Sequence, residues 1–123
     1  MRTFDFAILA LMLCTATSSH ADSGIFHATY TCERGVTVPT VYATLETGEN
    51  VAIIGVEGQQ VGLVQVQAAS GVKYAPANDV AGYIWWTKCD EASLYFRSGA
   101  DGSDEPLCLA TASRSNKLET DCA

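Results

Sequence analysis

Short runs rich in valine, isoleucine, threonine and tyrosine recur along the chain at intervals near ten residues, separated by glycine, asparagine and aspartate. Beyond residue 21 no stretch carries a helical period, so the pattern predicts strands joined by turns. Seven or eight short strands in a chain of 123 residues predict an all-β antiparallel barrel or sandwich. The predicted strands are 27–34, 36–44, 51–56, 60–69, 80–89, 92–97 and 106–112, with another resuming at Tyr74.

Two positions disturb the simple strand pattern. In the run 60–69 the apolar side chains occupy both phases of a strand, which cannot all be buried on one face: Val61, Leu63, Val64 and Val66. We therefore expect a β-bulge near Gly62 or Leu63. Pro39 in the second run suggests an edge position or a bulge, because proline cannot donate a ladder hydrogen bond.

The first 21 residues are typical of a secretory signal peptide. Arg2 gives a positive start, Phe6–Leu13 is an apolar run too short to span a bilayer, and Ser19-His20-Ala21 offers small residues at a cleavage site. We expect residues 1–21 to be removed, leaving one exported, periplasmic domain at 22–123. The alternative is a lipoprotein acylated at Cys14, but Leu13 stands where such signals usually have a small residue.

Four cysteines follow the predicted signal peptide, and an even number in a small exported chain predicts two disulfides. Of the three possible connectivities we favour Cys32–Cys108 and Cys89–Cys122. The wide spacing of the cysteines and the presence of a single further histidine, His27, argue against a metal site.

The formal net charge of −7 argues against nucleic acid and anionic membrane surfaces as partners, because both would repel the chain. It favours a basic partner, or only solubility. Catalysis is not expected either: His27 lies at the start of the first strand, and the carboxylate pairs Asp90-Glu91 and Asp101 with Asp104 lie in predicted turns. We expect no enzyme, no cofactor and no metal.

Two motifs remain as candidate binding residues. Ser70-Gly71-Val72-Lys73-Tyr74 is explained as a turn, or as a tight loop that projects the Ser70 hydroxyl while Gly71 permits close approach of a partner. In the aromatic run 83–88, Trp85 and Trp86 must face opposite sides of a strand. One can then enter the core and the other can anchor an interface. Lys88 ends that run as an isolated cation.

In order along the chain, these features resemble the inhibitors of c-type lysozyme that Gram-negative bacteria place in the periplasm or on the outer membrane, the MliC/PliC type. The matching residues are Tyr30-Thr31-Cys32, Ala69–Tyr74, Trp86-Thr87-Lys88, Glu91-Ala92-Ser93-Leu94 and Cys108. The chain departs from the family at Cys89, where the family usually has glycine, and in the tail that carries Cys122.

The resemblance implies an eight-stranded barrel that inserts a loop into the active-site cleft of c-type lysozyme, a typically basic protein. Ser70 and Lys88 would meet the catalytic carboxylates, with Gly71, Lys73, Tyr74 and Trp86 completing the lysozyme-binding set. The alternatives are a barrel that binds a small apolar ligand against Trp85 or Trp86, and a structural envelope protein. The sequence does not give the oligomeric state.

Overall fold

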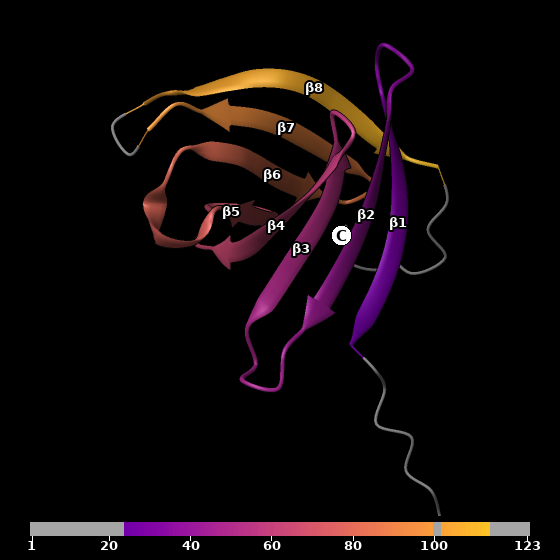
Figure 1. Cartoon of the computed structure of the whole chain (residues 1–123). Coiled ribbons are helices and arrows are strands. Elements are labelled where there is room, and N and C mark those ends of the chain that lie inside the picture. The colour runs from indigo at the N-terminus through magenta and orange to yellow at the C-terminus, as the bar shows by residue number, and fades with distance from the viewer. Residues whose placement is uncertain (1–23, 100–101, 114–123) are drawn as a thin grey trace, which may run out of the picture.

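The computed structural model describes residues 24–99 and 102–113, which form a closed, antiparallel, eight-stranded barrel (Figure 1). Each strand pairs with the next in sequence, and β1 pairs with β8 to close the barrel. This confirms the all-β prediction and selects the barrel over the sandwich. The elements are β1 Ile25–Cys32, β2 Thr37–Thr44, β3 Asn50–Val56, β4 Gln59–Val66, β5 Val72–Ala75, the 3-10 turn η1 Ala77–Asp79, β6 Gly82–Lys88, β7 Glu91–Arg97 and β8 Asp104–Ala112.

Because consecutive strands run in opposite directions, their connections alternate between the two ends of the barrel. The connections 45–49, 67–71 and 89–90 share one end, which we call the 67–71 end. In Figure 1, β1 to β3 run steeply while β6 to β8 cross the view, so the strands are strongly tilted relative to one another. This topology brings two segments that are about twenty residues apart in sequence, the connection 67–71 and the end of β6, to the same end.

The interior is filled by side chains that alternate along each strand, as a period of two requires. Trp85 and Tyr30 are the largest fully buried side chains, and their rings meet edge to face with centroids 5.0 Å apart. The Tyr42 hydroxyl accepts a hydrogen bond from Trp85 Nε1 at 2.9 Å and lies 2.8 Å from the Tyr30 hydroxyl. Burial raises the pKa of Tyr42 far above its usual range, so this hydroxyl stays protonated. Trp85 enters the core, as the strand geometry predicted.

The bulge expected near Gly62 or Leu63 was wrong. β4 pairs in continuous register with β3 and with β5, so its strict alternation is kept. Leu63 is buried, whereas Val66 lies 36% exposed on the outer surface. The outer face of a barrel tolerates single apolar side chains, so the second phase can stay on the surface and no bulge is needed. The register shift lies instead between β7 and β8, at Leu94/Tyr95.

Several predicted strand limits also need correction. Pro39 lies within β2 opposite Thr29 and is not on a sheet edge, since a closed barrel has none. β4 ends at Val66, three residues earlier than predicted, and β6 begins two residues later, at Gly82. β8 begins at Asp104, which the sequence placed in an exposed acidic loop.

The predicted Cys32–Cys108 disulfide is confirmed, and it links β1 to β8 where the barrel closes. Within the described residues this is the one disulfide whose two partners are both seen. Cys122, the predicted partner of Cys89, lies outside the described residues, as does the predicted signal peptide with Cys14. No helix in the described ranges is long and apolar enough to cross a membrane.

Candidate functional site

Gly71 brings the connection 67–71 directly against the end of β6. Its backbone has φ +66°, a conformation that favours glycine, and a Cβ atom at this position would collide with the carbonyl oxygen of Thr87. The same Cβ would lie 3.3 Å from Cβ of Lys88. Only glycine therefore allows the chain to pass this close, and the close passage sets exposed Ser70 beside the residues that end β6.

Trp86 fixes the backbone of this connection. Its side chain points to the outer side of the barrel, opposite to Trp85, and its indole Nε1–H donates a hydrogen bond of 2.8 Å to the carbonyl oxygen of Ser70. The Thr87 hydroxyl donates to the carbonyl of Val72 at 3.3 Å. Both interactions join β6 to the segment that carries Ser70, so the aromatic run and the loop motif act as one unit.

Lys88 is exposed at the end of β6, opposite Glu91 in the β6–β7 hairpin. Among the residues that the structure describes, its ammonium takes part in no salt bridge. Ser70, Trp86 and Lys88 all line one surface hollow of about 260 Å³, together with Glu91 and Tyr95. The structure thus brings together the serine and the lysine that the sequence selected separately, with the ammonium available to a partner.

The turn after Lys88 has a conformation that favours glycine, although this chain carries Cys89 there. Cys89 has φ +60°, in the left-handed region that non-glycine residues seldom adopt. The glycine that the resembling family usually carries here would meet this requirement without strain. In this chain cysteine adopts the left-handed conformation, and Lys88 is the last residue of β6.

Lys73 is held in place by two groups of the protein. Its Nζ lies 3.7 Å from Oδ2 of Asp104 and 4.9 Å from the centroid of the Trp86 ring, and its side chain is 17% exposed. Arg97 binds both carboxylate oxygens of Asp104, from Nε at 2.7 Å and from a terminal nitrogen at 3.1 Å. The hydrogen bonds from Arg97 lower the pKa of Asp104, so the carboxylate stays ionised.

Tyr74 is only 7% exposed, because its side chain points into the barrel and lies 5.5 Å from the Tyr42 ring. Burial raises the pKa of its hydroxyl. It can support the loop from inside the barrel, but it offers little surface to a partner. The predicted set therefore divides into exposed residues, Ser70, Gly71 and Lys88, and residues held within the protein's own contacts, Lys73, Tyr74 and Trp86.

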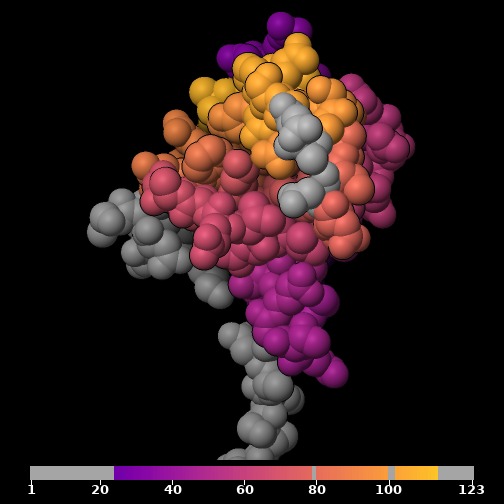
Figure 2. Space-filling view, turned by 90° about the vertical axis from the view of Figure 1, so that its left-hand side faces the viewer, coloured from indigo at the N-terminus to yellow at the C-terminus, as the bar shows by residue number. Residues whose placement is uncertain are grey.

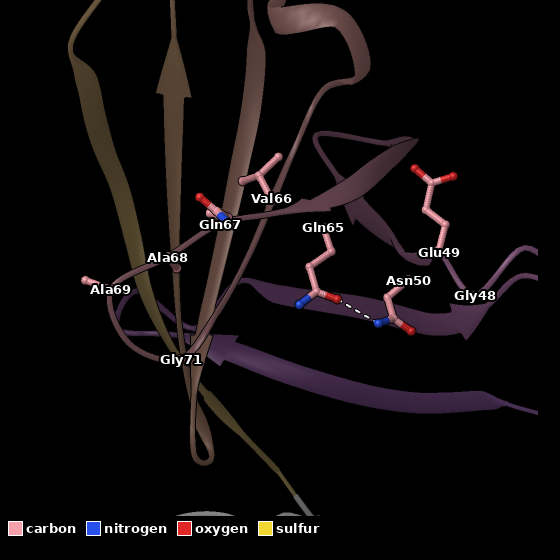
Figure 3. A pocket seen from close by; sticks show the side chains of 9 residues that line it. All are labelled: Gly48, Glu49, Asn50, Gln65, Val66, Gln67, Ala68, Ala69 and Gly71. Atoms are coloured by element: carbon pink, nitrogen blue, oxygen red, sulfur yellow. Dashed lines mark hydrogen bonds between the residues drawn. The ribbon is translucent and has the colours of Figure 1, made fainter.

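A second, larger hollow of about 810 Å³ is also lined by residues of the connection 67–71. Figure 3 shows the residues that line it, among which Asn50 Nδ2 donates to Gln65 Oε1 at 2.7 Å: Gly48, Glu49, Asn50, Gln65, Val66, Gln67, Ala68, Ala69 and Gly71. The β2–β3 turn projects from the body of the barrel (Figure 2). The connection 67–71 thus contributes to both hollows, with Ser70 lining the smaller one and Gln67, Ala68, Ala69 and Gly71 lining the larger one.

Sequence reasoning missed Asp104, Arg97 and the β2–β3 hairpin as parts of this region. Asp104 was assigned to a loop by composition, and only its pairing with Arg97 across the β7–β8 hairpin reveals its role. Nothing in the local sequence indicates that the β2–β3 turn shares a hollow with the connection 67–71, because that proximity follows from the alternating directions of the paired strands. In the described ranges no three histidine, cysteine or acidic side chains are grouped so that they could hold a metal ion.

The fold and the exposed serine–lysine pair define a small barrel suited to protein binding, and comparison with known proteins gives its family. Residues 30–102 match the family described as MliC, membrane-bound lysozyme inhibitor of c-type lysozyme. The curated "Membrane-bound lysozyme inhibitor of C-type lysozyme" of Pseudomonas aeruginosa is 40% identical over 82 residues, covering 64% of this chain. The match spans 60% of that relative's length.

Two solved structures share the fold. The periplasmic lysozyme inhibitor of c-type lysozyme from Salmonella typhimurium superposes with a TM-score of 0.60 at 24% identity, over 73% of this chain and 99% of that one. Pseudomonas aeruginosa MliC in complex with hen egg white lysozyme gives 0.54 at 29% identity, over 74% and 86%. The chain belongs to the MliC family of lysozyme inhibitors. Membership in a family of inhibitors confirms the prediction that it is not an enzyme.

Proposed function

We propose that the protein inhibits c-type lysozyme by inserting the connection 67–71 into the active-site cleft, so that Ser70 and Lys88 meet the catalytic carboxylates. The observation that carries this proposal is the common hollow of Ser70 and Lys88, with the Lys88 ammonium exposed and, among the described residues, outside any salt bridge. A relative, Pseudomonas aeruginosa MliC, has been crystallised with hen egg white lysozyme, which supports the choice of partner.

The chemistry of lysozyme explains why a lysine beside a serine would inhibit it. Lysozyme cleaves its substrate with two carboxyl groups, one of which must be protonated to act as the general acid. An ammonium between them pairs with the ionised carboxylate, lowers the pKa of the other and fills space that a sugar ring needs. The Ser70 hydroxyl can donate and accept hydrogen bonds in the same cleft.

The remaining predicted residues have supporting roles in this proposal. Gly71 permits the close passage over Thr87, Trp86 holds the Ser70 carbonyl, and Tyr74 supports the loop from the core. Lys73 belongs to the same surface, but its ammonium is already paired with Asp104. In the bound state we expect Trp86 to contact lysozyme with the part of its ring that Lys73 leaves open.

We also propose a second disulfide, Cys89–Cys122, and export to the periplasm by the 1–21 signal peptide. A bridge at Cys89 would fix the turn directly after Lys88, where a left-handed conformation is already required. Peptide mapping of the unreduced protein by mass spectrometry would show a peptide pair that contains Cys89 and Cys122. The position of the mature N-terminus, at Asp22 or at an acylated Cys14, tests the mode of export.

The function is tested by a cell-wall lysis assay with purified, oxidised protein of residues 22–123. We expect stoichiometric loss of lysis by a c-type lysozyme and unchanged lysis by a g-type lysozyme. Unchanged c-type lysis by correctly folded, disulfide-bonded protein would reject the proposal. Inhibition of both enzymes would instead indicate an effect on the cell wall and not on the lysozyme active site.

A further inference from the structure

A chain of contacts runs across the outer face of β5 to β8 and ends at the loop that carries Ser70. It begins with Asp104 at the start of β8, whose two carboxylate oxygens are bound by Arg97 at 2.7 and 3.1 Å. A two-point contact between a guanidinium and a carboxylate fixes the orientation of both groups. Asp104 therefore presents a rigid negative charge to its next neighbour.

That neighbour is Lys73 of β5. Oδ2 of Asp104 lies 3.7 Å from the Lys73 ammonium. The same ammonium lies 4.9 Å from the ring centroid of Trp86, which is paired with Lys73 on the neighbouring strand β6. A lysine side chain alone is flexible and strongly hydrated. The side chains of Lys73 and Asp104 are only 17% and 23% exposed. The carboxylate therefore keeps the ammonium over the indole ring of Trp86, and this contact restricts the orientation of the ring.

The last link is the hydrogen bond from the Trp86 indole to the Ser70 carbonyl at 2.8 Å. In the described part of the chain it is the one side-chain hydrogen bond that reaches residues 67–71. The orientation of the indole ring therefore sets the position of the backbone next to the Ser70 hydroxyl. The contacts among Asp104, Lys73 and Trp86 therefore act on a loop with which Asp104 itself, in the described ranges, makes no hydrogen bond or salt bridge.

We propose that Asp104 is a positioning residue for the Ser70 loop, acting through Lys73 and Trp86 and without contacting lysozyme. The proposal rests on the proposed function for what the loop does when bound, but the contact chain belongs to the free protein. It assigns Lys73 a role different from that of Lys88. Lys88 is available to the partner, whereas Lys73 preorganises the loop and lowers the cost of ordering it on binding.

The test compares Asp104→Asn, which removes the charge and keeps the shape, with Glu105→Gln as a matched control. Glu105 is the next residue on β8, is exposed and makes no salt bridge with the described residues. Hydrogen exchange of the Trp86 indole N–H, followed by NMR in the free protein, reports directly on its bond to Ser70. We expect a several-fold faster exchange in Asp104→Asn and an unchanged rate in Glu105→Gln; equal rates in all three proteins would overturn the proposal.

Binding to lysozyme supplies the second readout. Asp104→Asn should bind roughly twofold to tenfold more weakly, as expected for loss of one organised cation–π contact. In a Trp86→Phe background, where the indole donor is gone, the same substitution should have little further effect. An equal loss of affinity in both backgrounds would show that Asp104 does not act through Trp86.

The two readouts separate this inference from the proposed function. Wild-type protein that fails to inhibit lysozyme rejects the proposed function, while the indole exchange still tests the contact chain. Wild-type protein that inhibits, with Asp104→Asn indistinguishable from it in both readouts, rejects the inference alone. If Asp104→Asn does not fold, Lys73→Met removes the same ammonium while keeping the apolar stem, and the same expectations apply to it.

Discussion

Lys88 is the residue on which the proposed inhibition depends most, because its ammonium would be enclosed with a lysozyme carboxylate after binding. Truncation of a buried interfacial charge pair typically costs about 2–5 kcal/mol. We expect Lys88→Ala to weaken binding by roughly that amount in titration calorimetry. Arg34→Ala is the control, since Arg34 is also basic and exposed but lies in the β1–β2 turn at the opposite end. Wild-type affinity in Lys88→Ala would contradict the mechanism, though not the partner.

Gly71 gives a second prediction at the level of one residue, with Gly58 as a matched control. Both have positive φ, +66° and +76°, so alanine strains the backbone at either position. A Cβ at Gly58 meets nothing within 4 Å, whereas one at Gly71 collides with the Thr87 carbonyl. We expect Gly58→Ala to cost about 1–3 kcal/mol of stability in urea unfolding and to leave lysozyme affinity unchanged.

Gly71→Ala should destabilise more than Gly58→Ala and should also lose affinity, because the loop must move away from β6 to relieve the collision. The decisive comparison is affinity under conditions where both variants are folded. If both variants bind lysozyme equally well, the close passage of the loop over β6 has no part in inhibition.

At the residue scale, the sequence selected residues that the structure places close together, but it did not predict which of their charged groups are already paired within the protein. Ser70 and Lys88 were selected by motif, and the structure brings them to one hollow. Lys73 was predicted as a contact residue as well, yet its ammonium is paired with Asp104. A local motif carries no information about a partner three strands away, so the difference between the two lysines was invisible until the strands were placed.

At the scale of elements, the period of two predicts which residues share a face of a strand, but it does not predict whether that face is buried or exposed. In β4 both phases carry apolar residues, and we interpreted this as a bulge. The structure keeps the alternation and leaves Val66 on the surface, beside the second hollow. The period of two was thus a reliable guide, and the assumption that every valine must be buried was not.

The disulfide should stabilise the pairing of β1 with β8, which closes the barrel. The pairing of these strands covers only Tyr30–Cys32 against Ala110–Ala112, and Cys32–Cys108 links the same two strands. In the loop-entropy model, a bridge that closes a loop of 76 residues contributes about 4 kcal/mol. We expect the double variant Cys32→Ser, Cys108→Ser to lose roughly that amount in urea unfolding.

The same double variant should keep its affinity for lysozyme wherever it is folded, since neither cysteine lines the hollow of Ser70 and Lys88. Affinity and stability can be measured on one preparation at low denaturant. An unchanged unfolding midpoint would mean that backbone pairing alone closes the barrel. A large loss of affinity in the folded variant would mean that the closure also sets the loop.

At the scale of the whole molecule, composition gave the net charge of −7 but not its distribution. Barrel topology places four acidic residues of the β2–β3 and β6–β7 hairpins at the 67–71 end: Glu46, Glu49, Asp90 and Glu91. Lys88, the basic group in the proposed mechanism, lies at the same end. An acidic rim would attract a basic lysozyme, while Lys88 engages only after docking.

This arrangement predicts that salt slows association more than it speeds dissociation. Between about 10 mM and 150 mM ionic strength the Debye length falls from roughly 30 to 8 Å, which screens steering but not contacts that exclude water. We expect the association rate, measured by stopped flow, to fall by roughly tenfold or more while dissociation changes little. Glu49→Gln should reduce the low-salt rate more than Glu33→Gln, which removes the same charge from the β1–β2 turn at the opposite end. Equal effects of the two substitutions would assign steering to net charge alone, and a rate independent of salt would exclude steering altogether.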